Sequence, residues 1–334
     1  MHERPSGPLQ PLVVIGMHRS GTSLAASLLE NSGLDIGDRL MEGNWSNPRG
    51  HFEDMDFIEF QRGALVQLGL HQDGWLTSEL PELPGDLVGR ARALVDRKQQ
   101  RGRPWGWKDP RTVLFLPLWS LLVPEAAFAL VYRAPWEVVE SLYRRGDAIL
   151  ADDPELAVKI WVHYNRTLLH LARAAPARCV LVNVETMIAD PAAWVAAVAE
   201  RSGIPLRAPD TAICEPALFH GDQARDRAGV IFRHYPDAVE LFAALERDAF
   251  RPAGMEAPEP SAHSPTADAE RRLAMRDWHG LCSALAERDR TKGDMQRVLA
   301  ALERAGEAVT DAQEGASKTA SRLTHPLGSA GWPQ

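Results

Sequence analysis

The stretch from Val13 to Leu29, VVIGMHRSGTSLAASLL, constrains the fold of this 334-residue chain more than any other. Its apolar, β-branched start predicts a buried strand, a turn bounded by Gly16 and Gly21 follows, and the apolar spacing after the turn is typical of a helix. A loop between a strand and a helix N-terminus presents backbone N–H groups and the positive end of the helix dipole to an anion. The stretch therefore predicts an anion-binding loop, with an ordinary tight strand-to-helix turn as the alternative.

This loop differs from the phosphate-binding loop of nucleoside-triphosphate proteins in one residue type. The Gly-x4-Gly spacing is kept, but Thr22 and Ser23 directly follow the second glycine, where that motif has a lysine. Arg19 is the strong cation of the loop. Without the lysine, the loop is poorly suited to the terminal phosphates of a magnesium nucleotide, whereas hydroxyls, backbone amides and a guanidinium suit a less charged oxyanion.

Short apolar runs alternate with helical patterns over the first 205 residues. Such alternation predicts an α/β fold of the P-loop-containing type, with a central parallel sheet flanked by helices. Ligands of such sheets bind beyond the carboxyl ends of the strands, so Gly16 to Ser23, Lys108 to Arg111, Arg133 and Glu185 are expected near one edge. The expected strands are 12–16, 104–108, 128–133 and 179–185, and the expected helices are 22–31, 57–68, 135–147, 154–174 and 191–202.

The composition changes after Phe250. We expect an α/β domain over 1–250, a Pro/Ala-rich linker over 251–270, a helical extension over 271–313 and a disordered tail over 314–334. The extension has apolar residues at helical spacing, interrupted by Gly293: Trp278, Leu281, Leu285, Met295, Leu299 and Leu302. Two interpretations remain open, an amphipathic helix that packs on its own domain or is exposed, and a coiled coil for self-association or partner docking.

Charge and cysteine content argue against several classes of protein. A net charge of −8 argues against nucleic acid as a partner, because phosphate backbones select basic faces. Cys179, Cys214 and Cys282 lie far apart, which disfavours a disulfide framework or a zinc site and suits a reducing compartment. No apolar run has the length of a signal peptide or a membrane span, so we expect a cytoplasmic protein.

A second anion site is predicted in LVYRAPWEVVES. Arg133 ends an expected strand, and Ser141 follows eight residues later, about two turns into the next helix. That spacing brings the guanidinium and the hydroxyl together, where they can share an anion. Two anion sites at neighbouring strand ends suggest one ligand with phosphates at both ends, and a structural ion pair of Arg133 is the alternative.

These motifs resemble the cytosolic and Golgi sulfotransferases, which use 3′-phosphoadenosine-5′-phosphosulfate (PAPS). GMHRSGTS resembles their 5′-phosphosulfate loop, closest to that of tyrosylprotein sulfotransferases and many bacterial members, and YRAPWEVVES resembles their 3′-phosphate site. WGWKDPRT is similar to a Lys-Asp-Pro segment of the same enzymes, and the resemblance covers about 11–205. It implies a PAPS-dependent enzyme that needs no metal, with cofactor-binding residues His18, Arg19, Ser20, Gly21, Thr22, Ser23, Arg133 and Ser141.

The resemblance also implies catalytic roles. Arg19 and Lys108 would supply countercharge, and a base would take the proton of the acceptor hydroxyl. In NPRGHFEDMDF, Glu53 is the leading candidate for that base, His51 the second and Asp54 the third. One alternative is that Glu53 and Asp54 are acidic first-turn residues of the next helix. A separate alternative is that Asp109 is the base or orients Lys108. Arg49 and Arg111 would bind an anionic acceptor or pair with these acids.

The expected acceptor is a hydroxyl of a carbohydrate, a glycolipid or another small metabolite. Carbohydrate is suggested by tryptophans around the predicted site, since sugars stack on aromatic faces, and core packing is the alternative. These are Trp45, Trp75, Trp105 and Trp107. Two other functions compete: a degenerate P-loop nucleotide kinase or NTPase, and a noncatalytic adapter with a vestigial cofactor site.

Overall fold

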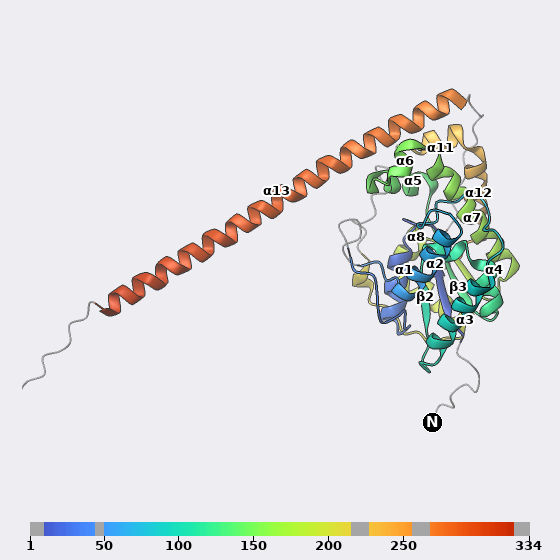
Figure 1. The fold of residues 1–334 in the computed structure, drawn as a ribbon, viewed down its shortest axis with the longest axis horizontal. Coiled ribbons are helices and arrows are strands. Elements are labelled where there is room, and N and C mark those ends of the chain that lie inside the picture. Colours follow the sequence, from blue (N-terminus) through green and yellow to red (C-terminus); the bar gives the residue numbers. More distant parts are fainter. Residues whose placement is uncertain (1–9, 44–49, 215–226, 256–267, 324–334) are drawn as a thin grey trace, which may run out of the picture. The chain divides into compact units, whose positions relative to one another are not determined.

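The computed structural model describes residues 10–43, 50–214, 227–255 and 268–323 (Figure 1). In these residues four parallel strands form one sheet in the order β2-β1-β3-β4. Because all four run the same way, their carboxyl ends lie along one edge. The predicted α/β class with a central parallel sheet is confirmed. The strands are β1 (Leu12–Ile15), β2 (Gly106–Lys108), β3 (Ala127–Tyr132) and β4 (Cys179–Asn183).

Helices lie on both sides of this sheet (Figure 1). Five of them match the expected ranges closely: α1 (Thr22–Asn31), α2 (Met55–Gln67), α5 (Pro135–Arg145), α7 (Leu156–Ala174) and α9 (Pro191–Ser202). The sequence patterns did not single out α3 (Gly85–Gln99), α4 (Leu116–Leu122), α6 (Ala148–Asp152), α8 (Val184–Ala189), α11 (Ala228–His234) and α12 (Pro236–Asp248). Short 3-10 turns occur at Pro110–Val113 and Thr211–Ile213.

The ends of α9 show how local sequence fixes a helix. The Asp190 carboxylate accepts the N–H of Ala193 at 2.9 Å, and Pro191 occupies the first turn, where no backbone donor is required. Gly203 then ends the helix with a left-handed φ of 67°. These features begin and end α9 at the residues that the sequence predicted.

The core lies between the sheet and the helices. Every residue of β1, β3 and β4 is buried, as expected for parallel strands covered on both faces. One apolar cluster joins β1 and β3 to α1 and α9, with Val14, Leu28, Val131 and Trp194 among its members. An aromatic cluster covers β2 and α2, where the rings of Phe57 and Trp107 stack at 4.4 Å.

The C-terminal part of the chain is a single helix, α13 (Asp268–Leu323), of 56 residues. The chain divides at Gly280 into two compact units, so the later part of α13 forms a unit of its own. The helix continues ten residues past 313, a stretch that contains Ala316 and Ala320, and alanine is the best helix former. In the described residues, no helix combines the length and apolar character required to cross a membrane.

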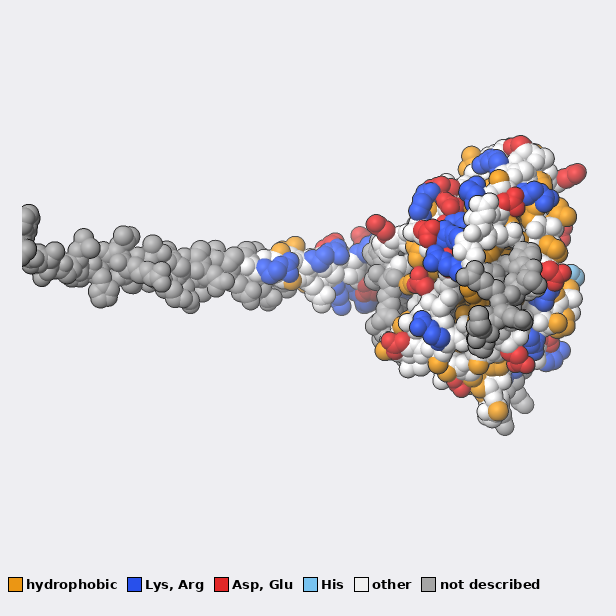
Figure 2. All heavy atoms as spheres, turned by 90° about the horizontal axis from the view of Figure 1, so that it is seen from below, with side chains coloured by type: hydrophobic (Ala, Val, Ile, Leu, Met, Phe, Trp, Pro, Cys, Tyr) orange, Lys and Arg blue, Asp and Glu red, His pale blue; other side chains and the backbone are white. Residues whose placement is uncertain are grey.

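On the body of the molecule, Lys and Arg side chains lie among Asp and Glu side chains on the face that Figure 2 shows. This mixture fits the net charge of −8.

Candidate functional site

The loop between β1 and α1 turns tightly at the carboxyl edge of the sheet. Gly16 lies so close to β3 that a Cβ there would approach the carbonyl oxygen of Val131 to 2.2 Å. Gly21, the N-cap of α1, has a φ of 90°, and Arg19 adopts a left-handed φ of 68° that costs a non-glycine residue energy. This strained turn holds the loop against the strand ends.

The interior of this loop fits an oxyanion. Ser20 is fully buried, yet its hydroxyl has no hydrogen-bond partner within the described part of the chain. A buried hydroxyl without a partner is costly, and an anion would satisfy it. Thr22 is also buried and opens α1, whose N-terminus carries the positive end of the helix dipole. His18 is tied back by a 3.0 Å bond from its Nε2 to the carbonyl oxygen of Asp73.

Arg19 links the loop to α5. Its Nε donates to the hydroxyl of Ser141 at 2.8 Å. Burial, followed by the charges of Arg145 and Arg133, lowers the pKa of Arg19 to about 10. The guanidinium stays protonated at neutral pH, so three positive charges are held close together. Such a cluster attracts an anion strongly.

Arg133 and Ser141 were predicted to share a phosphate. In the structure the Nε of Arg133 donates to the Glu137 carboxylate at 2.8 Å, and both side chains are buried. The hydroxyl of Ser141 instead accepts from Arg19. Arg133 thus forms the ion pair of the alternative interpretation and also adds positive charge close to Arg19. Its sharing of a phosphate with Ser141 stays a prediction.

Arg145 is a basic residue of this region that the sequence patterns did not single out. Its guanidinium lies 5.1 Å from the centre of the Trp75 ring and bonds the Asp147 carboxylate at 2.6 Å. The Trp75 ring in turn lies 4.9 Å from that of His18, in the loop. The sequence did contain a sign of its position, because Arg145 follows Ser141 by four residues and so lies on the same side of α5.

Lys108 brings three separate segments together. It ends β2, and its Nζ donates to the Glu53 carboxylate at 2.6 Å, to the Ser23 hydroxyl at 3.2 Å and to the His51 carbonyl at 3.2 Å. The Ser23 hydroxyl also donates to the His51 carbonyl. The predicted countercharge, the leading predicted base and the end of the predicted anion loop are thus in direct contact.

Glu53 is a buried carboxylate between two cations. Its second oxygen accepts from Arg111 at 3.3 Å. Burial alone would raise the pKa of Glu53, but Lys108 and Arg111 outweigh burial and hold it below its usual range. The preceding residue, Phe52, has a left-handed φ of 52°. Glu53 is therefore an ionised carboxylate at neutral pH, held at the loop by strained backbone.

His51 lies beside this pair as a neutral imidazole. Burial is the main cause that lowers its pKa, and the charges of Lys108, Arg19 and Arg145 lower it further, while Glu53 acts in the opposite direction. Its Nε2 is buried and lacks a hydrogen-bond partner in the residues that the structure describes. This nitrogen can accept a proton or a hydrogen bond from a ligand.

Asp109 binds Arg111 rather than Lys108 in the observed geometry. Its carboxylate accepts the backbone N–H of Arg111 at 2.9 Å and the guanidinium at 3.1 to 3.3 Å. Burial raises the pKa of Asp109, and Arg111 opposes that rise. Arg111 joins the two acids Asp109 and Glu53, so the predicted pairing of Arg111 with these acids describes its contacts.

Asp54 faces away from the loop. Its carboxylate accepts the N–H of Asp56 at 3.0 Å and so caps α2, and it forms a buried ion pair with Lys98 of α3. The interpretation as a structural acid at the helix start therefore suits Asp54. It does not suit Glu53, whose contacts are with β2 and Arg111.

Three of the four predicted tryptophans, those that the structure describes, lie in the core. Trp105 and Trp107 are fully buried in the core, and Trp75 is only 5% exposed. Their indole surface stabilises the fold, which corrects the suggestion that they offer stacking faces. Trp45 and Arg49 lie outside the described residues.

Glu185 lies in the first turn of α8, which is capped by the Asn183 side chain.

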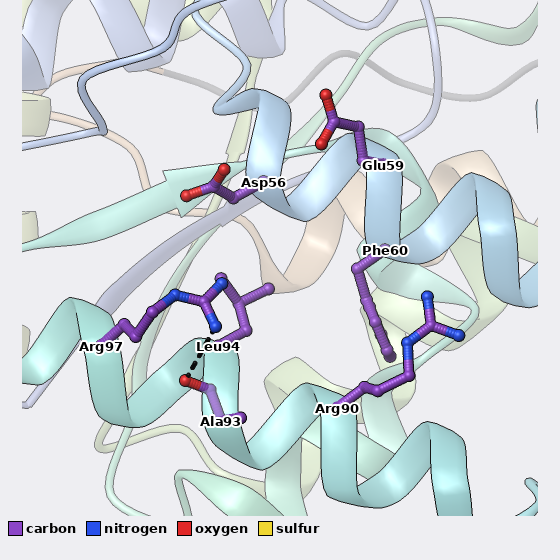
Figure 3. A pocket seen from close by; sticks show the side chains of 7 residues that line it. All are labelled: Asp56, Glu59, Phe60, Arg90, Ala93, Leu94 and Arg97. Atoms are coloured by element: carbon purple, nitrogen blue, oxygen red, sulfur yellow. Dashed lines mark hydrogen bonds between the residues drawn. The ribbon is translucent and has the colours of Figure 1, made fainter.

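A separate pocket of about 290 Å³ lies between α2 and α3 (Figure 3). Its two acidic groups have partners of their own, because Asp56 pairs with Arg39 and Lys98, and Glu59 pairs with Arg39. None of its lining residues was predicted to act. Across the described ranges, no group of three or more His, Cys, Asp or Glu side chains is arranged to hold a metal ion.

Fold and site together describe an α/β protein with a basic loop at the carboxyl ends of its parallel strands. The sequence profile described as "Sulfotransferase family" matches residues 11–208, more than half of the chain. The chain therefore belongs to the sulfotransferase family. No protein of curated function matches it.

Two solved structures are similar to this chain at low identity. The sulfotransferase domain of the Synechococcus PCC 7002 olefin synthase is 20% identical, with a TM-score of 0.44, over 75% of this chain and 100% of that domain. Sulfotransferase STF9 from Mycobacterium avium is 15% identical, with a TM-score of 0.42, over 73% of this chain and 76% of its own.

Proposed function

We propose that this protein transfers a sulfuryl group from PAPS to the hydroxyl of an acceptor. The contact of Lys108 with both Glu53 and Ser23 carries the proposal, because it joins a countercharge and a carboxylate base to an anion-binding loop. Family membership supports sulfuryl transfer as the reaction type. PAPS and the roles of individual residues are our inference.

The residues present fit the two charged ends of PAPS. The buried hydroxyl of Ser20 and the N-terminus of α1, with Gly21, Thr22 and Ser23, would hold the 5′-phosphosulfate. Ser141, Arg133 and Arg145 would hold the 3′-phosphate, with Arg19 between the two groups. When bound, PAPS would supply the sulfuryl group and a leaving bisphosphate in an in-line displacement that needs no metal.

Three side chains are assigned to the chemistry. Arg19 and Lys108 would neutralise negative charge that develops at the loop. Glu53 would take the proton of the acceptor hydroxyl, because it is ionised and lies against Lys108. The neutral imidazole of His51 is the second candidate for this proton. Lys108 contacts both Ser23 and Glu53, so its position couples the loop to the base.

We propose that the acceptor is a compound with a free hydroxyl group. A carbohydrate, a glycolipid or another small metabolite suits the reaction. Trp75, Trp105 and Trp107 are buried and give no particular support for a sugar. An acceptor screen should therefore include glycans, lipids and phenols alike.

Ligand-dependent stability tests the cofactor assignment. The bisphosphate product, 3′-phosphoadenosine 5′-phosphate, should raise the melting temperature without magnesium, and ATP should raise it much less. At a hundredfold excess over its dissociation constant, a ligand that binds only the native state stabilises it by about 2.7 kcal/mol. Strong magnesium-dependent stabilisation by ATP, with none by the bisphosphate, would instead support a nucleotide kinase. Transfer of labelled sulfate from PAPS to the acceptor panel would then test catalysis and separate an enzyme from an adapter.

A further inference from the structure

The later part of α13 exposes apolar side chains along a continuous helix. Met295 and Val298 are each 59% exposed, and Leu281 is 45% exposed. Between positions 287 and 298, every residue except Gly293 is exposed. A long helix in water gains its stability mainly by packing an apolar face, so this helix requires a partner for that face.

The sequence of this segment repeats every seven residues. One series, the a positions, is Leu281, Arg288, Met295, Leu302, Val309, Ala316 and Leu323. A second series three residues on, the d positions, is Ala284, Thr291, Val298, Ala305, Ala312 and Thr319. Arg288 is the only charged residue in the two series. The series define one seam from Leu281 to Leu323 with Arg288 as its single charged position, within the range that the structure shows as helix.

The period of the seam indicates what covers it. A straight α-helix has 3.6 residues per turn, so a seven-residue repeat drifts by about 20° per heptad around it. Six heptads would carry the seam about a third of the way around a straight helix. The repeat stays against a partner only if the partner is another helix and the two supercoil. A flat surface or a globular groove would not follow this seam.

The charges beside the seam suit a second copy of the same helix. In a parallel coiled coil in register, the g position of one helix meets the e position five residues later on the other. Glu287 occupies such a g position and Lys292 the matching e position. The pair has opposite charges and would form twice by symmetry. Arg288 would then lie next to Glu287 of the second copy.

The remaining flanking pairs contain no like charges. From Asp294 onward the g-to-e pairs are Asp294 with Leu299, Ala301 with Gly306, Ala308 with Gln313 and Gly315 with Ala320. The two copies of the seam therefore bring like charges together only at Arg288, which would face Arg288 of the second copy and be offset there by the neighbouring Glu287. We propose that two copies of this chain associate through residues 281–323 as a parallel, in-register, two-stranded coiled coil.

The mass of the full-length protein in solution tests this association. Sedimentation velocity should give a dimer whose fraction rises with protein concentration. Met295→Asp places a charge in the seam and should raise the dimer dissociation constant about tenfold or more. Gln296→Asp adds the same charge one residue outside the seam and should change the constant less than about threefold. The melting transition of the α/β unit should be unchanged in both variants.

Charge reversal tests the register. Glu287→Lys and Lys292→Glu should each weaken the dimer, because like charges then face each other. The double variant should restore part of the lost affinity, since the 287–292 pair is opposite in charge again while Arg288 keeps a like charge beside position 287. A monomer at every concentration up to about 100 µM would overturn the proposal, leaving the seam to another protein. Equal effects of Met295→Asp and Gln296→Asp would also overturn it. A double variant no stronger than the single variants would overturn the parallel register.

Discussion

Two adjacent residues, Glu53 and Asp54, form buried ion pairs that are chemically almost the same. Glu53 binds Lys108 at 2.6 Å, and Asp54 binds Lys98. All four side chains are nearly inaccessible to solvent. The pairs differ in what surrounds them, so burial of an ion pair does not by itself identify a catalytic site.

The Asp54 pair is enclosed by the fold. The Asp54 carboxylate caps α2 and presses against Gly37, where a Cβ would lie 2.4 Å from a carboxylate oxygen. Lys98 also pairs with Asp56 at 2.8 Å. These contacts join α2 to α3. The pair therefore has a structural role, and its loss should act on stability.

The Glu53 pair lies where three segments meet at the sheet edge. Phe52 before it has a strained backbone, Ser23 contacts it from the loop, and the Nε2 of His51 beside it has no partner in the described residues. Strain and unsatisfied polar atoms concentrate at functional sites. The comparison predicts that changes at one pair reduce turnover and that changes at the other reduce stability.

The largest expected effect follows Glu53→Gln. Removing a general base lowers turnover by about 10²- to 10⁴-fold, and the amide keeps the shape of the side chain. Affinity for 3′-phosphoadenosine 5′-phosphate should stay close to that of the wild type. Sulfate transfer and bisphosphate titration would measure the two quantities, below the melting temperature of the variant.

Asp54→Asn is the matched control for Glu53→Gln, since it makes the same change of carboxylate to amide one residue later. It should leave turnover per folded molecule within about threefold of the wild type. Full turnover in Glu53→Gln would reassign the proton to His51 or Asp109, which His51→Ala and Asp109→Asn would then distinguish.

Lys98→Met should lower the free energy of unfolding by about 3 to 5 kcal/mol, because it leaves buried Asp54 without its countercharge. Denaturant titration would measure the loss. The folded fraction should bind the bisphosphate normally. Lys108→Met, the same change at the other pair, should weaken bisphosphate binding as well. Normal bisphosphate binding by Lys108→Met would argue against the assignment of Lys108 as countercharge.

Part of the difference between the two ion pairs could be predicted from the sequence. The strands and the glycine spacing specify the sheet edge, so Lys108 and Ser23 could be predicted to meet there. Glu53 was pointed out by the resemblance to sulfotransferases and not by the strand pattern. The opposite directions of Glu53 and Asp54 depend on the strained turn at Phe52 and on α3. Helix α3 did carry a signal, because Leu87, Ala91 and Leu94 recur at helical spacing and are buried, but its many charged residues drew attention away from it.

Long-range contacts were the least predictable. Arg19 contacts Ser141 across 122 residues of sequence, and this contact depends on how α5 packs beside the loop. The position of Arg145 over Trp75 depends on a segment after α2. Sequence spacing suggested Arg133 as the partner of Ser141. The nearby Glu137, one helical turn on, forms the shorter local pairing instead.

Arg145→Ala should weaken bisphosphate binding by about 1.5 to 3 kcal/mol, the range for a hydrogen bond to a charged group. Arg144→Ala is the matched control, because Arg144 carries the same charge on the same helix and pairs with Glu140 at 3.2 Å. Isothermal titration at two salt concentrations would measure both. Equal losses in the two variants would show that only the general positive field matters.

The smallest effect concerns the histidine beside the Glu53 pair. Burial and nearby cations lower the pKa of His51 in the folded state, so below about pH 6.5 the unfolded chain binds a proton that the folded protein does not. Stability is therefore lost as the pH falls from about 6.5 towards the lowered pKa, by at most about 1.4 kcal/mol per pH unit. His51→Gln should make this decline shallower in urea titrations between about pH 7.5 and 5.5. His170→Gln, a change of an exposed histidine on α7, should leave the slope as it is in the wild type. An unchanged slope in His51→Gln would mean that the imidazole is solvated, which would remove the distinction between the surroundings of the two pairs.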